Sequence, residues 1–135
     1  MKNAQLVISQ SDFDLLQNHL KLSSKLSDFN RKKLSEELQS AQVVKQDDLP
    51  IDIVATNSQV EIEEVTAGQR FTFRLVSPDD ADMKRHRLSV LAPIGVALLG
   101  YGVGAEVQWE MPNGLKVFRI VNVTRDVLDA EPAGK

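Results

Sequence analysis

The sequence contains no cysteine, which excludes disulfide bridges, thiolate nucleophiles and cysteine-ligated metal sites. Its two histidines, His19 and His86, lie far apart in the chain and have no ligand cluster around them. No signal peptide is apparent at the start. The longest apolar stretch, Leu88 to Leu99, is interrupted by a serine, a proline and a glycine and is too short to span a bilayer. These absences predict a cytoplasmic protein with no metal, no cofactor and no membrane association.

Excess positive charge is also missing. The formal net charge is -3 at pH 7, which argues against a protein that grips nucleic acid mainly by neutralising phosphates. A protein partner with a basic surface stays compatible with this charge. The chain has 135 residues, of which 42% are hydrophobic, enough for one folded domain or one domain with a small appendage.

Glycine and proline are absent from the first third of the chain. All seven glycines and all five prolines fall at Pro50 or later. Glycine and proline are typical of the turns between strands, so their absence before Pro50 predicts that the chain has two parts. Residues 1–47 should be a helical hairpin and residues 48–135 a sheet domain.

The first part carries two apolar stripes with helical spacing. Ser9 or Ser11 is placed to cap the first helix, with Asp12 or Asp14 as a capping-box partner. A polar turn separates this helix from a second that begins near residue 27 or 28. The predicted stripes are Phe13, Leu16 and Leu20 in the first helix and Leu34, Leu38 and Ala41 in the second. Two such helices should pack as an antiparallel pair.

The second part alternates apolar and polar residues over several short segments, which predicts strands. Pro93 suits the first turn of a short helix that ends at Leu99 and is closed by Gly100. The Asn113-Gly114 pair predicts a hairpin turn. The expected fold is therefore α+β: a helical pair followed by an antiparallel sheet domain with one short helix. Trp109 should be a core residue of this sheet.

Two segments of the second part resemble a known family. The run from Leu88 to Gly100, LSVLAPIGVALLG, resembles the S-P-I-G-x-A-L-L-G signature of the GreA/GreB C-terminal domain. Upstream, residues 49–60 resemble the L-P-x-D-V-V-T-M-N-S-x-V stretch of the Rnk group, the regulators of nucleoside diphosphate kinase. The short helical pair also matches that group, because the transcript-cleavage factors carry a much longer one.

The resemblance implies an FKBP-like C-terminal domain and an N-terminal antiparallel coiled coil. It also implies docking on RNA polymerase at the rim of the secondary channel, with the coiled coil directed into that channel. Contacts with the polymerase would then come from Leu91, Ala92, Pro93 and Ile94. The coiled-coil tip would comprise Ser24, Lys25, Asp28, Arg31 and Lys32.

The tip departs from the cleavage factors, whose paired acidic residues help to hold a catalytic magnesium ion of the polymerase. Between Leu20 and Leu34 the only carboxylate is Asp28, and five cations surround it. One carboxylate is a poor donor set for a metal ion. The resemblance and this departure together predict a non-catalytic, monomeric regulator that competes with Gre factors and does not stimulate transcript cleavage.

Structural explanations compete with these assignments. Ala97, Leu98 and Leu99 should be buried, and Arg31, Lys32 and Lys33 fit a solvated helix face as well as a contact with acidic channel residues. Asp28 suits a helix N-cap. His19 should lie on an exposed part of the first helix. The acidic and basic residues between Asp79 and Arg87 are expected to form a solvated loop.

The main alternative function is that of an FKBP-like peptidyl-prolyl isomerase or a chaperone-type binding module. Five of the seven aromatic residues lie in the second part, mostly at positions that look internal. An effect on nucleoside diphosphate kinase should be indirect, because the sequence has no glycine-rich phosphate-binding loop.

Overall fold

The structure, a computed structural model, describes residues 5–23 and 26–125 and confirms a mixed α+β fold. Its helices are α1 (Gln10–Leu22), α2 (Asp28–Gln39) and α3 (Pro93–Leu98). Its strands are β1 (Val7–Ser9), β2 (Gln42–Val44), β3 (Ser58–Glu64), β4 (Gln69–Val76), β5 (Arg87–Ser89), β6 (Glu106–Met111) and β7 (Gly114–Arg125). In the described residues no helix is long and apolar enough to cross a bilayer.

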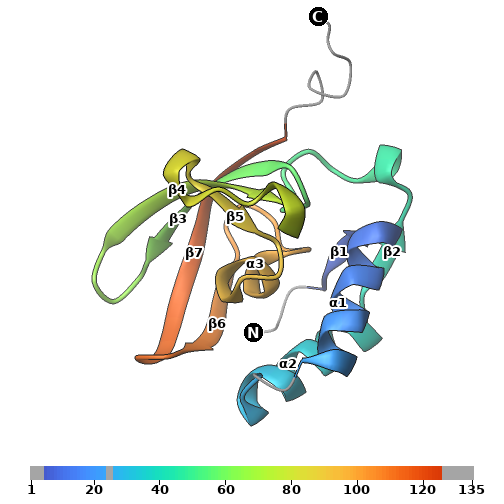
Figure 1. The fold of residues 1–135 in the computed structure, drawn as a ribbon, viewed down its shortest axis with the longest axis horizontal. Coiled ribbons are helices and arrows are strands. Elements are labelled where there is room, and N and C mark those ends of the chain that lie inside the picture. The colour runs from blue at the N-terminus through green and yellow to red at the C-terminus, as the bar shows by residue number, and fades with distance from the viewer. Residues whose placement is uncertain (1–4, 24–25, 126–135) are drawn as a thin grey trace, which may run out of the picture.

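Five strands form the main sheet in the order β5-β4-β3-β7-β6 (Figure 1). The β3–β4, β3–β7 and β6–β7 pairs are antiparallel, as expected. The prediction of a wholly antiparallel sheet is wrong at one edge, where β5 runs parallel to β4. The reason is the connection over residues 77–86, which contains two short 3-10 turns and carries the chain back before β5 begins.

A second, two-stranded sheet was not predicted. Its strands β1 and β2 pair in parallel and bracket the two helices. Each has only three residues, too few for a period-two pattern to stand out. The backbone N–H of Val7 donates to the carbonyl oxygen of Gly100 at 3.1 Å, which ties this small sheet to the region after α3.

The helix starts follow the capping signals only in part. Ser9 caps α1 through a hydrogen bond from the Asp12 backbone, and Ser27 caps α2 through one from the Asn30 backbone. The prediction that Asp28 is the cap is wrong, because Asp28 is already the first helical residue of α2. The predicted capping box is also wrong. The carboxylate of Asp12 instead accepts hydrogen bonds from Thr56.

One continuous apolar core joins both parts of the chain. Leu16, Leu34 and Leu38 from the helices belong to the same buried cluster as the inner face of the main sheet and the predicted core residue Trp109. Leu98 and Leu99 of the predicted buried group lie there too. Coiled-coil packing, an FKBP-like classification and a domain boundary after residue 47 stay predictions.

Candidate docking site between the helical tip and helix α3

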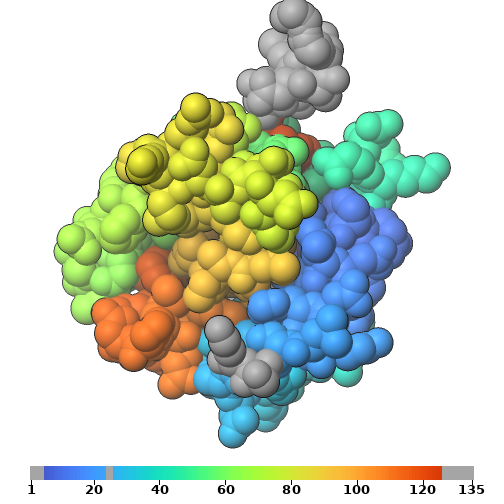
Figure 2. All heavy atoms as spheres, viewed as in Figure 1, coloured from blue at the N-terminus to red at the C-terminus, as the bar shows by residue number. Residues whose placement is uncertain are grey.

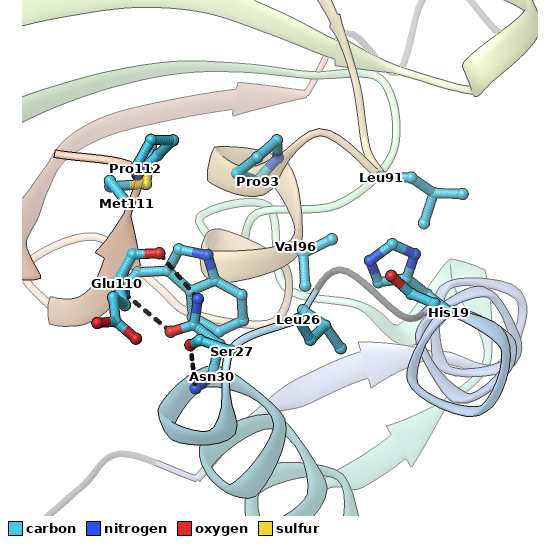
Figure 3. A pocket seen from close by; sticks show the side chains of 12 residues that line it. His19, Leu26, Ser27, Asn30, Leu91, Pro93, Val96, Glu110, Met111 and Pro112 are labelled. Carbon is cyan, nitrogen blue, oxygen red and sulfur yellow. Dashed lines mark hydrogen bonds between the residues drawn. The ribbon is translucent and has the colours of Figure 1, made fainter. Parts of the chain in front are cut away.

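A cavity of about 500 Å³ lies where the connection between α1 and α2 meets α3 and the β6–β7 hairpin (Figure 3). Leu91 and Pro93 line it from the α3 side. Ser23, Leu26 and Ser27 line it from the helical side. The segment with the family signature and the tip of the helical hairpin therefore face the same space. Figure 2 shows α3 bordered by the helical hairpin and by the β6–β7 hairpin on one surface of the molecule.

The start of α3 is shaped by a close backbone approach. Pro93 occupies the first turn of α3, where its missing N–H costs no hydrogen bond. A Cβ atom at Gly95 would lie 2.7 Å from the Val90 carbonyl oxygen, so only glycine fits there. Pro93 is exposed and its neighbours Ala92 and Ile94 are half-buried. Of the four predicted contact residues, Leu91 and Pro93 reach this cavity, and Ile94 lines a neighbouring hollow over the sheet.

Asn30 fastens the start of α2 to the free edge of the main sheet. Its side-chain amide donates to the Glu110 carbonyl oxygen at 2.8 Å, and its amide oxygen accepts from the Glu110 backbone N–H at 2.8 Å (Figure 3). This pair of bonds is what a neighbouring β-strand would supply to the edge strand β6. Because Asn30 is only 4% exposed, water does not readily replace the two bonds. The helical tip is thus held against the sheet domain.

Two further polar contacts fix the helices to the rest of the molecule. Glu37 of α2 accepts hydrogen bonds from Lys33 and from the Tyr101 hydroxyl. Burial of Tyr101, and then the neighbouring Glu37 carboxylate, raise the pKa of its phenol, so the hydroxyl stays a donor. At the start of α1, the Asp12 carboxylate accepts from the Thr56 hydroxyl at 2.6 Å and from its backbone N–H at 3.0 Å.

Two of the cations near the predicted tip, Arg31 and Lys33, form hydrogen bonds within the protein. The Arg31 guanidinium donates to the carbonyl oxygens of Leu20 and Ser23, at the end of α1, and Lys33 bonds Glu37 and Tyr101. Of the cations Arg31, Lys32 and Lys33, Lys32 is exposed and the other two are half-buried. A polymerase contact through these cations stays a prediction, and Lys32 is the one most open to a partner. Asp28 is exposed, whereas Ser24 and Lys25 lie outside the described residues.

Apolar side chains are exposed at the same tip. Leu22, the last residue of α1, is 78% exposed, and Phe29, in the first turn of α2, is 42% exposed. Two large apolar side chains on so short a tip are a feature of protein contact surfaces. The sequence reading treated neither as a site residue.

His19 is not the exposed surface residue that was predicted. It is half-buried and lines the cavity beside Leu91 (Figure 3). Burial, and then the positive charge of Arg31, lower the pKa of its imidazole below the usual 6.5. His19 is therefore a neutral wall of the cavity at neutral pH.

Within the described residues, the lining of the cavity is that of a binding surface and not of a metal site. Among residues 5–23 and 26–125 there is no group of three histidine, aspartate or glutamate side chains placed to hold a metal ion. The lining is mainly apolar, with Val96, Trp109 and Met111 beside the polar groups already described. This composition suits the binding of another molecule's side chains.

Comparison with known proteins bears directly on the α3 side of this cavity. The family model for the C-terminal domain of the transcription elongation factors GreA and GreB matches residues 49–125. GreA of Syntrophotalea carbinolica is 33% identical over 92 residues, which are 68% of this chain and 58% of that protein. The regulator of nucleoside diphosphate kinase of Escherichia coli K12 is 38% identical over 82 residues, which are 61% of this chain and 60% of that protein.

A solved structure agrees over almost the whole chain. The GreA/GreB transcription elongation factor of Nitrosomonas europaea is 35% identical with a TM-score of 0.66, over 90% of this chain and 99% of that one. By contrast, the chain spans about 60% of the length of the curated relatives it matches. The shared part includes α3, β6 and β7, which form the sheet side of the cavity.

Proposed function

This chain belongs to the GreA/GreB family of transcription elongation factors, and on that premise we propose that it binds RNA polymerase as a non-catalytic regulator. Its contact surface comprises the start of α3 and the tip of the helical hairpin. The polymerase region it occupies is the rim of the secondary channel, where it competes with Gre factors.

The observation that supports this proposal is the shared cavity. Leu91 and Pro93, from the family signature, lie across it from Ser27, and Asn30 holds the two sides together. A partner that binds the signature segment therefore also meets the helical tip. Exposed Phe29 and Leu22 add apolar contact area at that tip.

The expected absence of cleavage stimulation follows from the charge and the position of the tip. Asp28 is the only carboxylate between Leu20 and Leu34, and a second metal ion needs several oxygen ligands. Two hydrogen bonds between Asn30 and Glu110 also hold the tip against β6, so the tip does not project away from the sheet domain. This arrangement suits a protein that competes with Gre factors for their binding site on the polymerase and does not stimulate transcript cleavage.

The same reasoning makes any influence on nucleoside diphosphate kinase indirect. The relative with that name shares 38% of residues over the matched segment, and the present sequence has no glycine-rich phosphate-binding loop. An altered kinase level would then come from altered transcription.

Capture of core RNA polymerase by the immobilised protein, with and without excess GreB, tests the proposal. We expect capture that GreB reduces. Replacing Leu22 and Phe29 together by serine should weaken capture at least about tenfold, as expected for central apolar contacts. Met83→Ala is the control, because Met83 is also an exposed apolar residue but lies in the connection between β4 and β5, outside the helical hairpin and α3. Failure to capture polymerase would contradict the proposal.

A transcript-cleavage assay with the same samples tests the proposed absence of cleavage stimulation. We expect no stimulation of cleavage by the unmodified protein, and Asp28→Asn should leave capture within about twofold, since Asp28 is not expected to hold metal. Stimulated cleavage that Asp28→Asn removes would show that the protein is a cleavage factor.

A further inference from the structure

The main sheet extends past α3 on one side, where the β3–β4 and β6–β7 hairpins project (Figure 1). A hollow of about 330 Å³, lined by residues of both hairpins, lies there over the inner face of the sheet. Its floor is apolar and includes Phe71, Phe73 and Phe118, three of the five phenylalanines of the chain. Met111 is the one lining residue that this hollow shares with the cavity beside α3.

The core face of the sheet is incompletely covered at this hollow. Phe71 pairs with Ile62 of the neighbouring strand and lies on the same face of β4 as Phe73. Ile62 is 1% exposed and Phe73 is 7% exposed, whereas Phe71 is 44% exposed. The exposed part of the Phe71 ring is an apolar surface, and an apolar side chain of another molecule would be stabilised by covering it.

One cation lines the hollow. Lys116 of β7 lies on the same face of its strand as Phe118 and is half-buried. Within the described residues the Lys116 side chain forms no hydrogen bond or ion pair. The other half-buried lysines and arginines of this part of the chain all have partners; they are Arg31, Lys33, Arg74, Arg119 and Arg125. A half-buried ammonium group attracts an anion more strongly than a fully solvated one, because less water lies between the charges.

The carboxylate in the lining is already engaged within its own hairpin. Glu64 is 7% exposed and accepts hydrogen bonds from the backbone N–H groups of Thr66 at 3.0 Å and Ala67 at 3.2 Å. It therefore closes the turn between β3 and β4. The exposed side-chain amides of Gln69 and Asn113 complete the polar rim. Each amide can both donate and accept, which matches the N–H and C=O groups of a peptide backbone.

We propose that this hollow binds a peptide segment of a protein partner in which a large apolar side chain stands next to a carboxylate. The apolar side chain, best an aromatic one, packs on Phe71 and Phe118. The ammonium group of Lys116 binds the carboxylate, and Gln69 and Asn113 bond the peptide backbone. The hollow is at the small end of ligand cavities, which hold roughly 300–1,000 Å³, so it suits one large side chain. The proposal goes beyond polymerase binding and is tested without polymerase.

NMR titration of the full chain with the peptide acetyl-Gly-Ser-Phe-Asp-Ser-Gly-amide tests the proposal. We expect saturable amide shifts centred on residues 69–73 and 113–118. The same peptide with alanine in place of phenylalanine should bind at least about tenfold more weakly, because the anchor in the floor is lost. Asparagine in place of aspartate should weaken binding about threefold, as expected for a partly exposed ion pair. Lys116→Gln should abolish this difference between the aspartate and asparagine peptides, which a merely structural lysine would not do.

Phe71→Ser should weaken binding of the aspartate peptide at least about fivefold. Leu115→Ser is the matched control, because Leu115 is 52% exposed but lies on the opposite face of β7, and it should change the affinity less than about twofold. Lys84→Gln, exposed in the connection between β4 and β5, is the control for the lost charge. Binding that does not saturate, an equal loss in Leu115→Ser, or an aspartate preference that survives in Lys116→Gln would overturn the proposal.

Two further measurements distinguish other occupants of the hollow. Binding of 3-phenylpropionate as tight as that of the aspartate peptide would show that the hollow takes a free aromatic acid. A dimer of the unmodified chain in sedimentation equilibrium that dissociates in Phe71→Ser would show that a second copy covers the hollow. Either result would overturn the proposal, and neither bears on the capture of polymerase.

Discussion

The helical hairpin and the main sheet are held in place by different forces. The inner face of the sheet is apolar, and its largest buried side chains include Trp109, Ile62 and Ile120. The hairpin contributes fewer apolar residues to the same core but three of the five buried polar side chains of the described chain, Ser9, Asp12 and Asn30. Apolar burial is not directional, whereas buried hydrogen bonds fix the position of the groups they join.

This difference explains how a short hairpin can have a defined place. Each helix has only about three turns, and isolated helices of such length are marginal in water. The hairpin is stabilised by its leucines against the core and is oriented by Asn30, Glu37 and Asp12. Its position should therefore respond to single polar substitutions, and the sheet should respond to apolar ones.

The largest effect is expected from Trp109→Ala in the sheet. Trp109 is 1% exposed, so its loss leaves a large cavity and should lower the free energy of unfolding by roughly 3–5 kcal/mol. Urea unfolding followed by far-ultraviolet circular dichroism measures this. Gln108→Ala, at the neighbouring exposed position, is the control and should change little. A loss below about 1 kcal/mol for Trp109→Ala would mean that the sheet is not the main source of stability.

Leu38→Ala should be next, at roughly 2–4 kcal/mol, because Leu38 is buried between the hairpin and the core. The chain has one tryptophan, in the sheet, so its fluorescence can be compared with the helical signal at 222 nm. Both signals should shift together, since both regions share one core. If the helical signal alone moved to lower urea, the hairpin would be a separate unit. Gln39→Ala, exposed on the same helix, is the control.

Local signals in the sequence predicted much of this architecture. The leucines of the two stripes, the Ser9 cap of α1, the proline-started α3 and the hairpin turn before Gly114 depend on neighbours along the chain, and the structure contains each of them. Ala41, predicted in the second stripe, lies beyond the end of α2 at Gln39. Burial of Ala97, Leu98 and Leu99 followed from the same spacing. The parallel β4–β5 and β1–β2 pairs were missed because strand direction in such short segments depends on the path of the connections.

The site was predicted less completely, for a physical reason. Leu91 and Pro93 were found through the family signature, but Asn30 has its partner 80 residues away in Glu110. Nothing near Asn30 in the sequence indicates that its amide is buried. The half-burial of Lys33 could not be predicted for the same reason, because its partners include Tyr101, which is also remote in the chain.

A medium effect is expected from Asn30→Ala, which removes both bonds to Glu110 and leaves its N–H and carbonyl without those partners. The free energy of unfolding should fall by roughly 1–3 kcal/mol. Hydrogen exchange at the Glu110 amide should accelerate more than exchange in β3, at the centre of the sheet. Lys32→Ala, exposed on the same helix, is the control. Unchanged protection of Glu110 would show that the hairpin is not fastened through Asn30.

The smallest effect concerns pH and His19. Because burial and Arg31 lower its pKa in the folded protein, the unfolded chain takes up a proton near pH 6.5 while the folded chain does not. The free energy of unfolding should therefore fall as the pH drops below 6.5, until the folded protein also protonates His19. His19→Gln should flatten this dependence between pH 7.5 and 5.5, as measured by urea midpoints, whereas His86→Gln serves as the exposed control. Equal slopes for the unmodified chain and His19→Gln would mean that the folded protein tolerates a charged imidazole at the cavity wall as well as the unfolded chain does.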